Sequence, residues 1–231
     1  MTAFKDEIAF IRSNSARYAS DPEFHAEWFG LTERSVNLRA QQMRAFGTLV
    51  GSVTKTLAGW RILDVGCGSG FWLRAFLEFD ALPKDLVGID VSDARIKFAR
   101  AKNPLITLLH TDGITIPFEN ASFNLVTQSV TFSTMRSAAL RSHVVSEMSR
   151  VLKPGGFVFW WDHYAIAPTN ADTALRPADY FDWPIREFGV GELPRPSECL
   201  RSSDGLGPFL VGLDRLGHRV THTAALIGPK P

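Results

Sequence analysis

Cysteine is scarce in this chain of 231 residues, which holds only Cys67 and Cys199. Two cysteines so far apart cannot form the dense disulfide framework of small secreted domains, so a reducing compartment is expected. No apolar run reaches the roughly 20 residues that a membrane-spanning helix needs. The first residues, Met-Thr-Ala-Phe-Lys-Asp-Glu, lack the layout of a signal peptide. The sequence therefore predicts a cytoplasmic protein without a membrane span.

An excess of charge of one sign is also missing. Lys and Arg number 25, Asp and Glu 24, and the formal net charge is +1. The basic residues are scattered along the chain, which gives no reason to expect a nucleic-acid partner. The hydrophobic fraction of 45% is ordinary for a globular protein and sufficient for a core. We expect a single domain over residues 1–231.

A glycine-rich turn at residues 66–70 is the most distinctive feature that is present. Ile62, Leu63 and Val65 form an apolar run typical of a buried parallel strand. Glycines then follow at alternate positions, 66, 68 and 70, before a helical segment that begins at Phe71. Such a turn predicts backbone N–H groups that face a ligand. We interpret Cys67, inside the turn, as a small residue that fills space rather than as a nucleophile.

A second apolar strand, residues 85–90, ends in an acidic residue. Asp90 lies 20 residues after Gly70, and Ser92 is suited to cap the helix that follows. In a βαβ unit an acid at this strand end falls beside the first glycine turn, where it can accept both hydroxyls of a ribose. The alternative is that Asp90 only caps the helix. Because the glycine turn, the strand and the spacing between them occur together, the role of ribose binding is favoured for Asp90.

Short apolar strands alternate with helical segments along the middle of the chain. Further strands are predicted at residues 106–110, 123–128 and 157–161, with a helix from about Ser137 to Leu152 and a weak last strand at 221–227. This alternation is typical of right-handed crossovers and a parallel sheet covered on both faces. The first 56 residues are predicted to be helices, and the proline-rich residues 166–204 loops with a short helix near Asp179.

Six segments of this chain resemble, in order, the motifs of class I S-adenosylmethionine-dependent methyltransferases, in particular the group that acts on small molecules. The resemblance spans about residues 58–162, and the segments that carry it are Ile62–Gly70, Gly88–Ser92, Asp112–Gly113, Ile116–Phe118, Ser122–Val126 and Arg150–Gly156. It implies an α/β, Rossmann-like, doubly wound sheet of seven strands, with the last strand antiparallel. Residues 1–56 would then be a helical cap, 57–165 the cofactor-binding core, and 166–231 a lid and sheet edge.

The resemblance also implies where S-adenosylmethionine binds and S-adenosylhomocysteine forms. Its methionine end would lie on the turn of Gly66, Cys67 and Gly68, which Asp64 would order. The remaining cofactor residues would contact the ribose (Asp90), the adenine (Val91, Asp112 and Gly113) and the methionine ammonium (Gln128, with Ser129 beside it).

The acceptor decides whether methyl transfer needs a base, because an alcohol or phenol must lose its proton and a neutral amine needs little help. His163 and Asp162, directly after the fifth predicted strand, are the catalytic candidates, since an acid that orients a histidine makes a base near neutral pH. The alternative is that His163 is simply a polar residue at a strand end. The histidine spacing in the tail, His218 and His222, does not indicate a metal site.

The acceptor itself is the least determined part of the hypothesis. The tail from about Arg176 resembles methyltransferases of polysaccharide and glycolipid biosynthesis, which favours O-methylation of a sugar or similar hydroxyl on a small molecule or glycan. The alternatives are N-, C- or phenolic O-methylation of a natural product, or a protein that binds S-adenosylmethionine without catalysis. A nicotinamide-dependent oxidoreductase is disfavoured, because the turn reads Gly-x-Gly-x-Gly and not Gly-x-Gly-x-x-Gly. The oligomeric state is not predicted.

Overall fold

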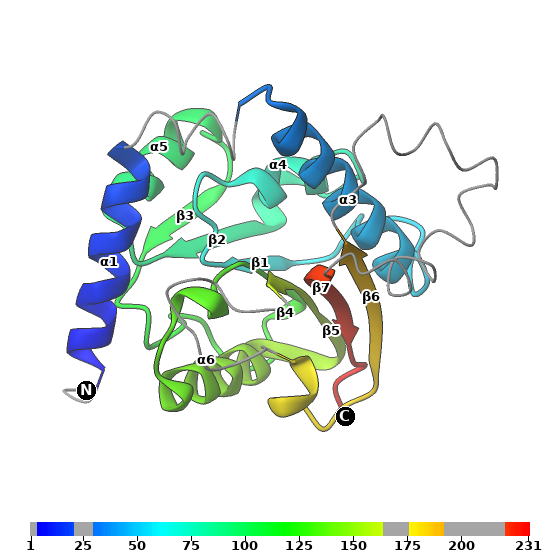
Figure 1. The fold of residues 1–231 in the computed structure, drawn as a ribbon. Helices are drawn as coiled ribbons and strands as arrows, with labels where there is room; N and C mark the ends of the chain where they lie inside the picture. The colour runs from blue at the N-terminus through cyan, green and yellow to red at the C-terminus, as the bar shows by residue number, and fades with distance from the viewer. Residues whose placement is uncertain (1–3, 21–29, 164–175, 192–219) are drawn as a thin grey trace.

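The computed structural model describes residues 4–20, 30–163, 176–191 and 220–231, and leaves aside the side chains of residues 16–20, 163, 188–191 and 220–223. Seven strands form one sheet across the middle, in the order β3-β2-β1-β4-β5-β7-β6 (Figure 1). They are β1 (Ile62–Val65), β2 (Leu86–Asp90), β3 (Thr107–His110), β4 (Phe123–Ser129), β5 (Leu152–His163), β6 (Ile185–Gly191) and β7 (Val220–Ile227). Strand β7 pairs antiparallel with both β5 and β6, and the other described pairs of strands are parallel. The predicted fold class is confirmed.

Helices cover both faces of this sheet. The first face carries α3 (Glu33–Val50), α4 (Phe71–Leu77) and α5 (Asp93–Lys102), and the second carries α1 (Lys5–Ser20) and α6 (Ala138–Val151). The described residues also form three short 3-10 helices: η1 (Pro83–Asp85), η2 (Phe132–Thr134) and η3 (Pro177–Asp179). The predicted short helix near Asp179 is η3. Within the described part of the chain, no helix is long and apolar enough to cross a membrane.

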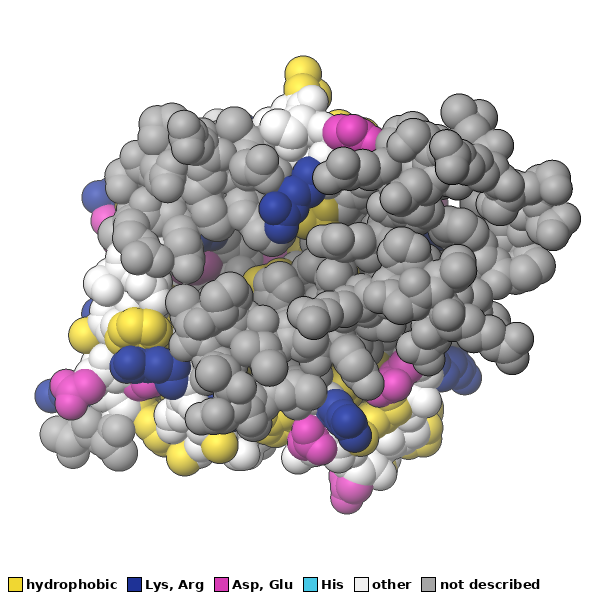
Figure 2. Space-filling model, viewed as in Figure 1, with side chains coloured by type: hydrophobic (Ala, Val, Ile, Leu, Met, Phe, Trp, Pro, Cys, Tyr) yellow, Lys and Arg dark blue, Asp and Glu magenta, His cyan; other side chains and the backbone are white. Residues whose placement is uncertain are grey.

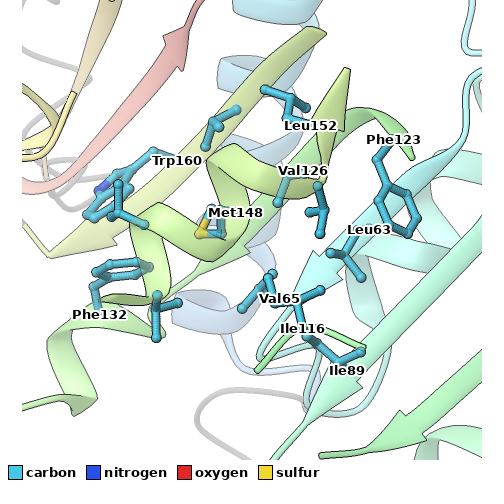
Figure 3. Packing of buried hydrophobic residues seen from close by; sticks show 14 of the residues in the cluster. Leu63, Val65, Ile89, Ile116, Phe123, Val126, Phe132, Met148, Leu152 and Trp160 are labelled. Carbon is cyan, nitrogen blue, oxygen red and sulfur yellow. The ribbon is translucent and has the colours of Figure 1, made fainter. Parts of the chain in front are cut away.

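The strands are apolar on both sides because each side of the sheet has its own core. Along β5, Val158 and Trp160 pack with α6, whereas Phe159 and Trp161 pack with α3 and α4. All four side chains have no exposed surface. Figure 3 shows the first core, in which the ring of Phe132 lies 4.4 Å from that of Trp160, centroid to centroid. The two-sided burial explains why these strands lack the alternation of polar and apolar residues.

Two predictions about the later strands are wrong. Residues 185–191 were expected to be loop, and they form the edge strand β6, which pairs along one side with β7. An edge strand needs one partner only, so it tolerates Gly189 and Gly191, which weaken the strand pattern in the sequence. The strand predicted over residues 157–161 begins earlier, at Leu152; its first residues contain an irregularity, since the pairing with β4 shifts between Phe123 and Leu125 and Gly155 has a φ of 77°.

The carboxyl ends of the central strands meet at one edge of the sheet. Val65, the last residue of β1, lies opposite Ile89 on one side and Gln128 on the other. Asp90 lies opposite His110. Open α/β sheets bind ligands at this edge, so we expect the ligand-binding site of this protein there.

Candidate active site

A cavity of about 640 Å³ lies over the carboxyl ends of β1, β2 and β4. Its described lining comes from α1, the glycine turn, the N-terminal half of α3 and the segments after β2, β3 and β4. Eight of the predicted cofactor residues line it: Asp64, Gly66, Cys67, Gly68, Asp90, Val91, Gly113 and Ser129. The other two, Asp112 and Gln128, are not among the lining residues.

The alternate glycines of the turn are required by the backbone conformation. Gly66, Gly68 and Gly70 have φ angles of 71°, 53° and 74°, in the left-handed region that other residues rarely adopt. A Cβ built on Gly66 would lie 2.2 Å from Oγ1 of Thr131, so space as well as conformation excludes a side chain there. The Gly-x-Gly-x-Gly pattern therefore folds the chain tightly under the cavity.

The N–H groups of this turn bond within the protein rather than facing a ligand as the sequence predicted. Those of Gly66 and Cys67 donate to the carbonyl oxygen of Ile89, at 2.8 and 3.0 Å. That of Gly68 donates to Oδ2 of Asp90 at 2.9 Å. These bonds tie the turn to the end of β2. The turn thus offers a ligand close approach to its backbone rather than a row of free N–H donors.

Cys67 is buried inside the turn, with 6% of its surface exposed. Burial raises the pKa of its thiol well above the ordinary value, and the carboxylates of Asp64 and Asp90 raise it further. A thiol in such surroundings stays protonated and is a poor nucleophile. These surroundings support the interpretation of Cys67 as a packing residue.

Asp90 is a buried carboxylate at the wall of the cavity. Its Oδ1 accepts a hydrogen bond from the N–H of Ser92 at 2.8 Å, in addition to the bond from Gly68. The alternative role, that of helix cap, is taken by Ser92, whose hydroxyl accepts from the N–H of Arg95 at the start of α5. Asp90 is therefore fixed in orientation at the cavity without being the cap.

Asp64 is the second buried carboxyl of the cavity and is 2% exposed. Burial raises its pKa to about 7; the nearby Asp90 adds to the increase, and a hydrogen bond from Thr127 opposes it. The hydroxyl of Thr127 donates to Oδ1 of Asp64 at 2.8 Å. The cavity thus contains two carboxyl groups close together, an arrangement that favours a bound cation.

The segment after β3 forms a tight turn against Val91. A Cβ on Gly113, whose φ is 76°, would lie 2.3 Å from Cγ1 of Val91. Asp112 is exposed, and its Oδ1 accepts from the N–H groups of Ile114 and Thr115 at 2.8 and 2.9 Å. In this structure Asp112 therefore orders the turn, while Val91 and Gly113 line the cavity.

Helix α1 contributes to the lining of this cavity and is held at two points. The guanidinium of Arg12 donates to the carbonyl oxygens of Val91, at 3.2 Å, and Thr111, at 3.5 Å. Nε of Arg136 lies 3.4 Å from Oε2 of Glu7, and its guanidinium lies 3.6 Å from the ring centroid of Phe10. The predicted helical cap therefore includes α1 as a wall of the site.

Two predicted site residues, Gln128 and Asp162, have no exposed surface and hold the segment that follows β4. Oε1 of Gln128 accepts from the N–H of Thr131 at 3.2 Å. Oδ2 of Asp162 accepts from the N–H groups of Phe132 and Ser133 at 3.1 and 3.3 Å. Since Thr131 and Ser133 line the cavity, both side chains shape its wall from behind.

The structure does not bring the carboxylate of Asp162 to the cavity lining. His163 ends β5 and its Cα pairs with that of His222 on β7, but its side chain is outside the described part of the chain. The predicted pairing of these two residues in catalysis therefore stays a prediction. Among the described residues, no group of three or more His, Cys, Asp or Glu side chains could hold a metal ion.

Three polar residues of the cavity lining were not found from the sequence: Arg39 and Gln42 on α3, and Arg95 on α5. They belong to no motif, and a helical pattern alone does not show which half of α3 overhangs the site. Nε of Arg95 is buried and has no hydrogen-bond partner within the described structure. The cavity thus has basic as well as acidic walls.

Comparison with known proteins finds similarity to methyltransferases, as the order of the sequence motifs predicted. A family model described as a methyltransferase domain matches residues 62–156. The demethylmenaquinone methyltransferase of Shouchella clausii (strain KSM-K16) is 36% identical over 104 residues, which cover 43% of each chain. That of Staphylococcus aureus (strain MRSA252) is 35% identical over 103 residues, 43% of this chain and 42% of that protein. The match spans less than half the length of these relatives.

Solved structures share the fold across most of the chain. A SAM-dependent methyltransferase from Archaeoglobus fulgidus has a TM-score of 0.62 at 15% identity, covering 90% of this chain and 99% of that one. An S-adenosylmethionine-dependent methyltransferase from Mesorhizobium loti has a TM-score of 0.57 at 17% identity, covering 80% and 98%. In sequence match over residues 62–156, motif order and sheet topology, the chain is similar to the class I S-adenosylmethionine-dependent methyltransferases.

Proposed function

We propose that this protein transfers the methyl group of S-adenosylmethionine to a small, largely apolar acceptor in the cavity over the sheet. One observation carries the proposal: the glycine turn, Asp90, and the pair Val91 and Gly113 line a single cavity that also extends under α1 and α3. The glycine turn, Asp90, Val91 and Gly113 would contact the nucleoside and the amino-acid end of S-adenosylmethionine. The part of the cavity under α1 and α3 leaves room for the methyl acceptor.

The charge of the cavity suits this methyl donor. When bound, S-adenosylmethionine supplies an electrophilic methyl group on a positively charged sulfonium. Asp64 and Asp90 are buried carboxyl groups, and burial is the main cause of the raised pKa of Asp64. A cation beside these carboxyl groups favours their ionised forms. The residues present therefore fit the cofactor.

The roles of the lining residues follow from their positions. The carboxylate of Asp90 would accept the ribose hydroxyls, and Val91 with Gly113 would enclose the adenine. The turn at Gly66, Cys67 and Gly68 would approach the methionine end closely. Asp112, Gln128 and Ser129 would support the cavity walls around the bound cofactor. Such residues act by orientation and by exclusion of water, which supply much of the rate in an in-line methyl transfer.

The apolar walls bear on the choice of acceptor. Four apolar residues that line the cavity, Ile11, Ile116, Met135 and Val144, are at most 9% exposed. Such a wall suits a flat phenol or quinol ring better than a sugar, whose hydroxyls need polar partners. The curated relatives named as demethylmenaquinone methyltransferases support a ring acceptor. We therefore place ring methylation ahead of sugar O-methylation, which remains the second candidate.

Calorimetry with S-adenosylhomocysteine and with NADH tests the cofactor. We expect the first to bind and the second not, because the turn lacks the dinucleotide spacing. Binding of NADH alone would overturn the proposal. Transfer of radiolabelled methyl groups to panels of phenols, quinols, sugars and amines then separates an enzyme from a protein that only binds the cofactor, and shows which acceptor class is used.

Replacement of His163 by alanine tests the general base. If the acceptor is a phenol or an alcohol, loss of the base is expected to lower kcat by on the order of a hundredfold or more. The affinity for S-adenosylhomocysteine, measured by calorimetry, is expected to stay within about twofold. His143, on α6 and not among the cavity-lining residues, gives the matched His143→Ala control. An unchanged kcat would remove His163 from the mechanism.

A further inference from the structure

Residues 130–134, here called the wall segment, follow β4 and form one wall of the cavity. Four of the five line it: Val130, Thr131, Ser133 and Thr134. A Cβ on Gly66 would lie 2.2 Å from Oγ1 of Thr131, so the segment begins against the glycine turn that would approach the methyl donor. The chain then continues into Met135, one of the apolar residues of the lining that suit a ring acceptor. The wall segment therefore connects the donor part of the cavity with the acceptor part.

Val130 has a backbone conformation that its side chain disfavours. Its φ is 56°, in the left-handed region, where a β-branched residue is a genuine outlier. The other described residues that share this region without being glycine, Asp80 and Ala121, do not line the cavity. Strained residues gather at functional sites and persist only where the surrounding structure holds them. Val130 therefore requires contacts that keep the wall segment in place.

Hydrogen bonds to three strands hold the start of the wall segment. The N–H of Val130 donates to the carbonyl oxygen of Trp161 on β5 at 2.8 Å. Oγ1 of Thr131 donates to the carbonyl oxygen of Val65, at the end of β1, at 3.0 Å. The N–H of Thr131 donates to Oε1 of Gln128 on β4 at 3.2 Å. These bonds fix the first two residues of the segment relative to the sheet.

The carboxylate of Asp162 holds the next two residues. Its Oδ2 accepts from the N–H groups of both Phe132 and Ser133. Acidic side chains at the surface lie beside basic ones, as Figure 2 shows for one face, whereas Asp162 has no exposed surface. Burial of a carboxylate is costly unless it is hydrogen-bonded, and hydrogen bonds to a charged acceptor are strong. The two bonds from the wall segment are therefore important to both partners.

We propose that Asp162 is a positioning residue for methyl transfer, which acts through the wall segment and not by carrying a proton, an inference that rests on the proposed function. Asp162 is not among the lining residues, so its effect on a bound acceptor passes through Phe132 and Ser133. An in-line displacement requires the acceptor atom, the methyl group and the sulfur to be aligned, and a displacement of about 1 Å lowers the rate by about a hundredfold. By fixing the wall segment, Asp162 fixes the acceptor relative to the donor.

The first experiment measures amide hydrogen exchange of the wall segment by NMR and needs no acceptor. We expect Phe132 and Ser133 to exchange about tenfold faster or more in Asp162→Ala than in wild type, because their N–H groups lose their acceptor. Exchange in Asp162→Asn is expected to stay close to that of wild type, since an amide oxygen can replace Oδ2. The amides of β1 report on global stability. Equal acceleration in β1 and the wall segment, or none in either, would overturn the inference.

The second experiment measures methyl transfer from S-adenosylmethionine to 1,4-dihydroxynaphthalene, a quinol ring of the proposed acceptor class. Asp162→Ala is expected to lower kcat by about a hundredfold, and its affinity for S-adenosylhomocysteine, measured by calorimetry, to stay within about twofold of wild type. Asp162→Asn is expected to keep kcat within about fivefold of wild type, with the same pH profile. An unchanged kcat in Asp162→Ala, or an equal loss in both variants, would show that Asp162 does not act by positioning.

The matched control is Ser137→Ala, which also removes a side-chain acceptor of a backbone N–H group. The hydroxyl of Ser137 accepts from the N–H of Leu140 at 3.2 Å, at the start of α6 and outside the cavity lining. We expect a lower thermal midpoint, because a helix cap is lost, with kcat and the exchange of the wall segment as in wild type. A loss of kcat as large as that of Asp162→Ala would mean that reduced stability alone explains the effect, against the inference.

A pair of variants at Val130 keeps the inference testable if Asp162→Ala does not fold. Val130→Gly and Val130→Ala both remove most of the side chain, but only glycine adopts the left-handed region without steric cost. We expect the higher thermal midpoint in Val130→Gly, the reverse of the usual order of these two residues. A higher midpoint in Val130→Ala would show that this residue is not held under strain and would overturn the inference.

Failure of the proposed function gives a different pattern of results. If wild type binds no S-adenosylhomocysteine, or binds it and does not methylate 1,4-dihydroxynaphthalene, the proposed donor or acceptor class is wrong. The amide exchange of the Asp162 variants and the thermal midpoints of the Val130 variants still show whether Asp162 holds a strained wall segment in place.

Discussion

An Asp90→Asn protein is expected to bind S-adenosylhomocysteine at least about a hundredfold more weakly than wild type. Hydrogen bonds to a charged group contribute about 1.5–3 kcal/mol each, and the ribose offers two hydroxyls. The amide would also place a donor against the N–H of either Gly68 or Ser92, both of which donate to this carboxylate. If that N–H is the one of Gly68, the glycine turn loses one of its three hydrogen bonds to the end of β2 and keeps those of Gly66 and Cys67.

The matched control for this prediction is Asp93→Asn. Asp93 is an exposed acid three residues later, paired with Lys97 at 2.6 Å on the surface of α5. Exposed pairs of this kind contribute little to stability, so the control is expected to bind S-adenosylhomocysteine as wild type does. Calorimetry on both variants checks the contrast. Wild-type affinity in Asp90→Asn would exclude Asp90 from the cofactor site.

Replacement of Asp64 by asparagine is expected to stabilise the ligand-free protein above pH 7, by up to about 4 kcal/mol. Burial raises the pKa of Asp64 from 3.8 to about 7, so ionisation is unfavourable in the folded state. Asparagine keeps an oxygen for the hydroxyl of Thr127, which lies 2.8 Å from Oδ1 of Asp64. The variant therefore removes the charge and retains the hydrogen bond.

The direction of the pH dependence follows from proton binding. Between pH 4 and pH 7 the folded wild type keeps a proton on Asp64 that the unfolded chain has lost. The free energy of unfolding of wild type therefore falls as pH rises through this window, relative to the variant, and the difference is complete above pH 7. Urea denaturation of both proteins at pH 4.5 and pH 8 measures it. A difference that is the same at both pH values would show that Asp64 does not titrate as described.

Much of the fold could be predicted because its strands carry a strong local signal. Strands such as β1 are buried on both faces and appear in the sequence as apolar runs, and glycines mark the turn after β1. The edge strand β6 could not be predicted in this way, since it contains Gly189 and Gly191 and depends on pairing with β7, distant in sequence. Local patterns report on burial, and an edge strand is specified largely by its partner.

The candidate site, like the fold, contains some residues that the sequence predicts and others that it does not. Asp64, Asp90 and Gly113 are predictable because each stands at a fixed offset from a strand end, and the topology brings strand ends together. Arg39 and Gln42 lie on a helix before the first strand, where no offset relates them to the sheet. Their place in the cavity follows from the packing of Phe46 and Leu49, a tertiary contact that the helical pattern does not specify.

The insertion of β7 between β5 and β6 has a consequence for the order in which the protein folds. During synthesis β6 emerges before β7, yet β7 is its sole partner among the described strands of the sheet. The backbone groups along one edge of β5 and one edge of β6 therefore stay unpaired until the synthesis of a strand that begins 29 residues after β6 ends, at Val220. Pairing across such a separation is slow compared with local contacts. The half of the sheet that carries β1 to β4 has no such dependence, so it can assemble before the far edge closes.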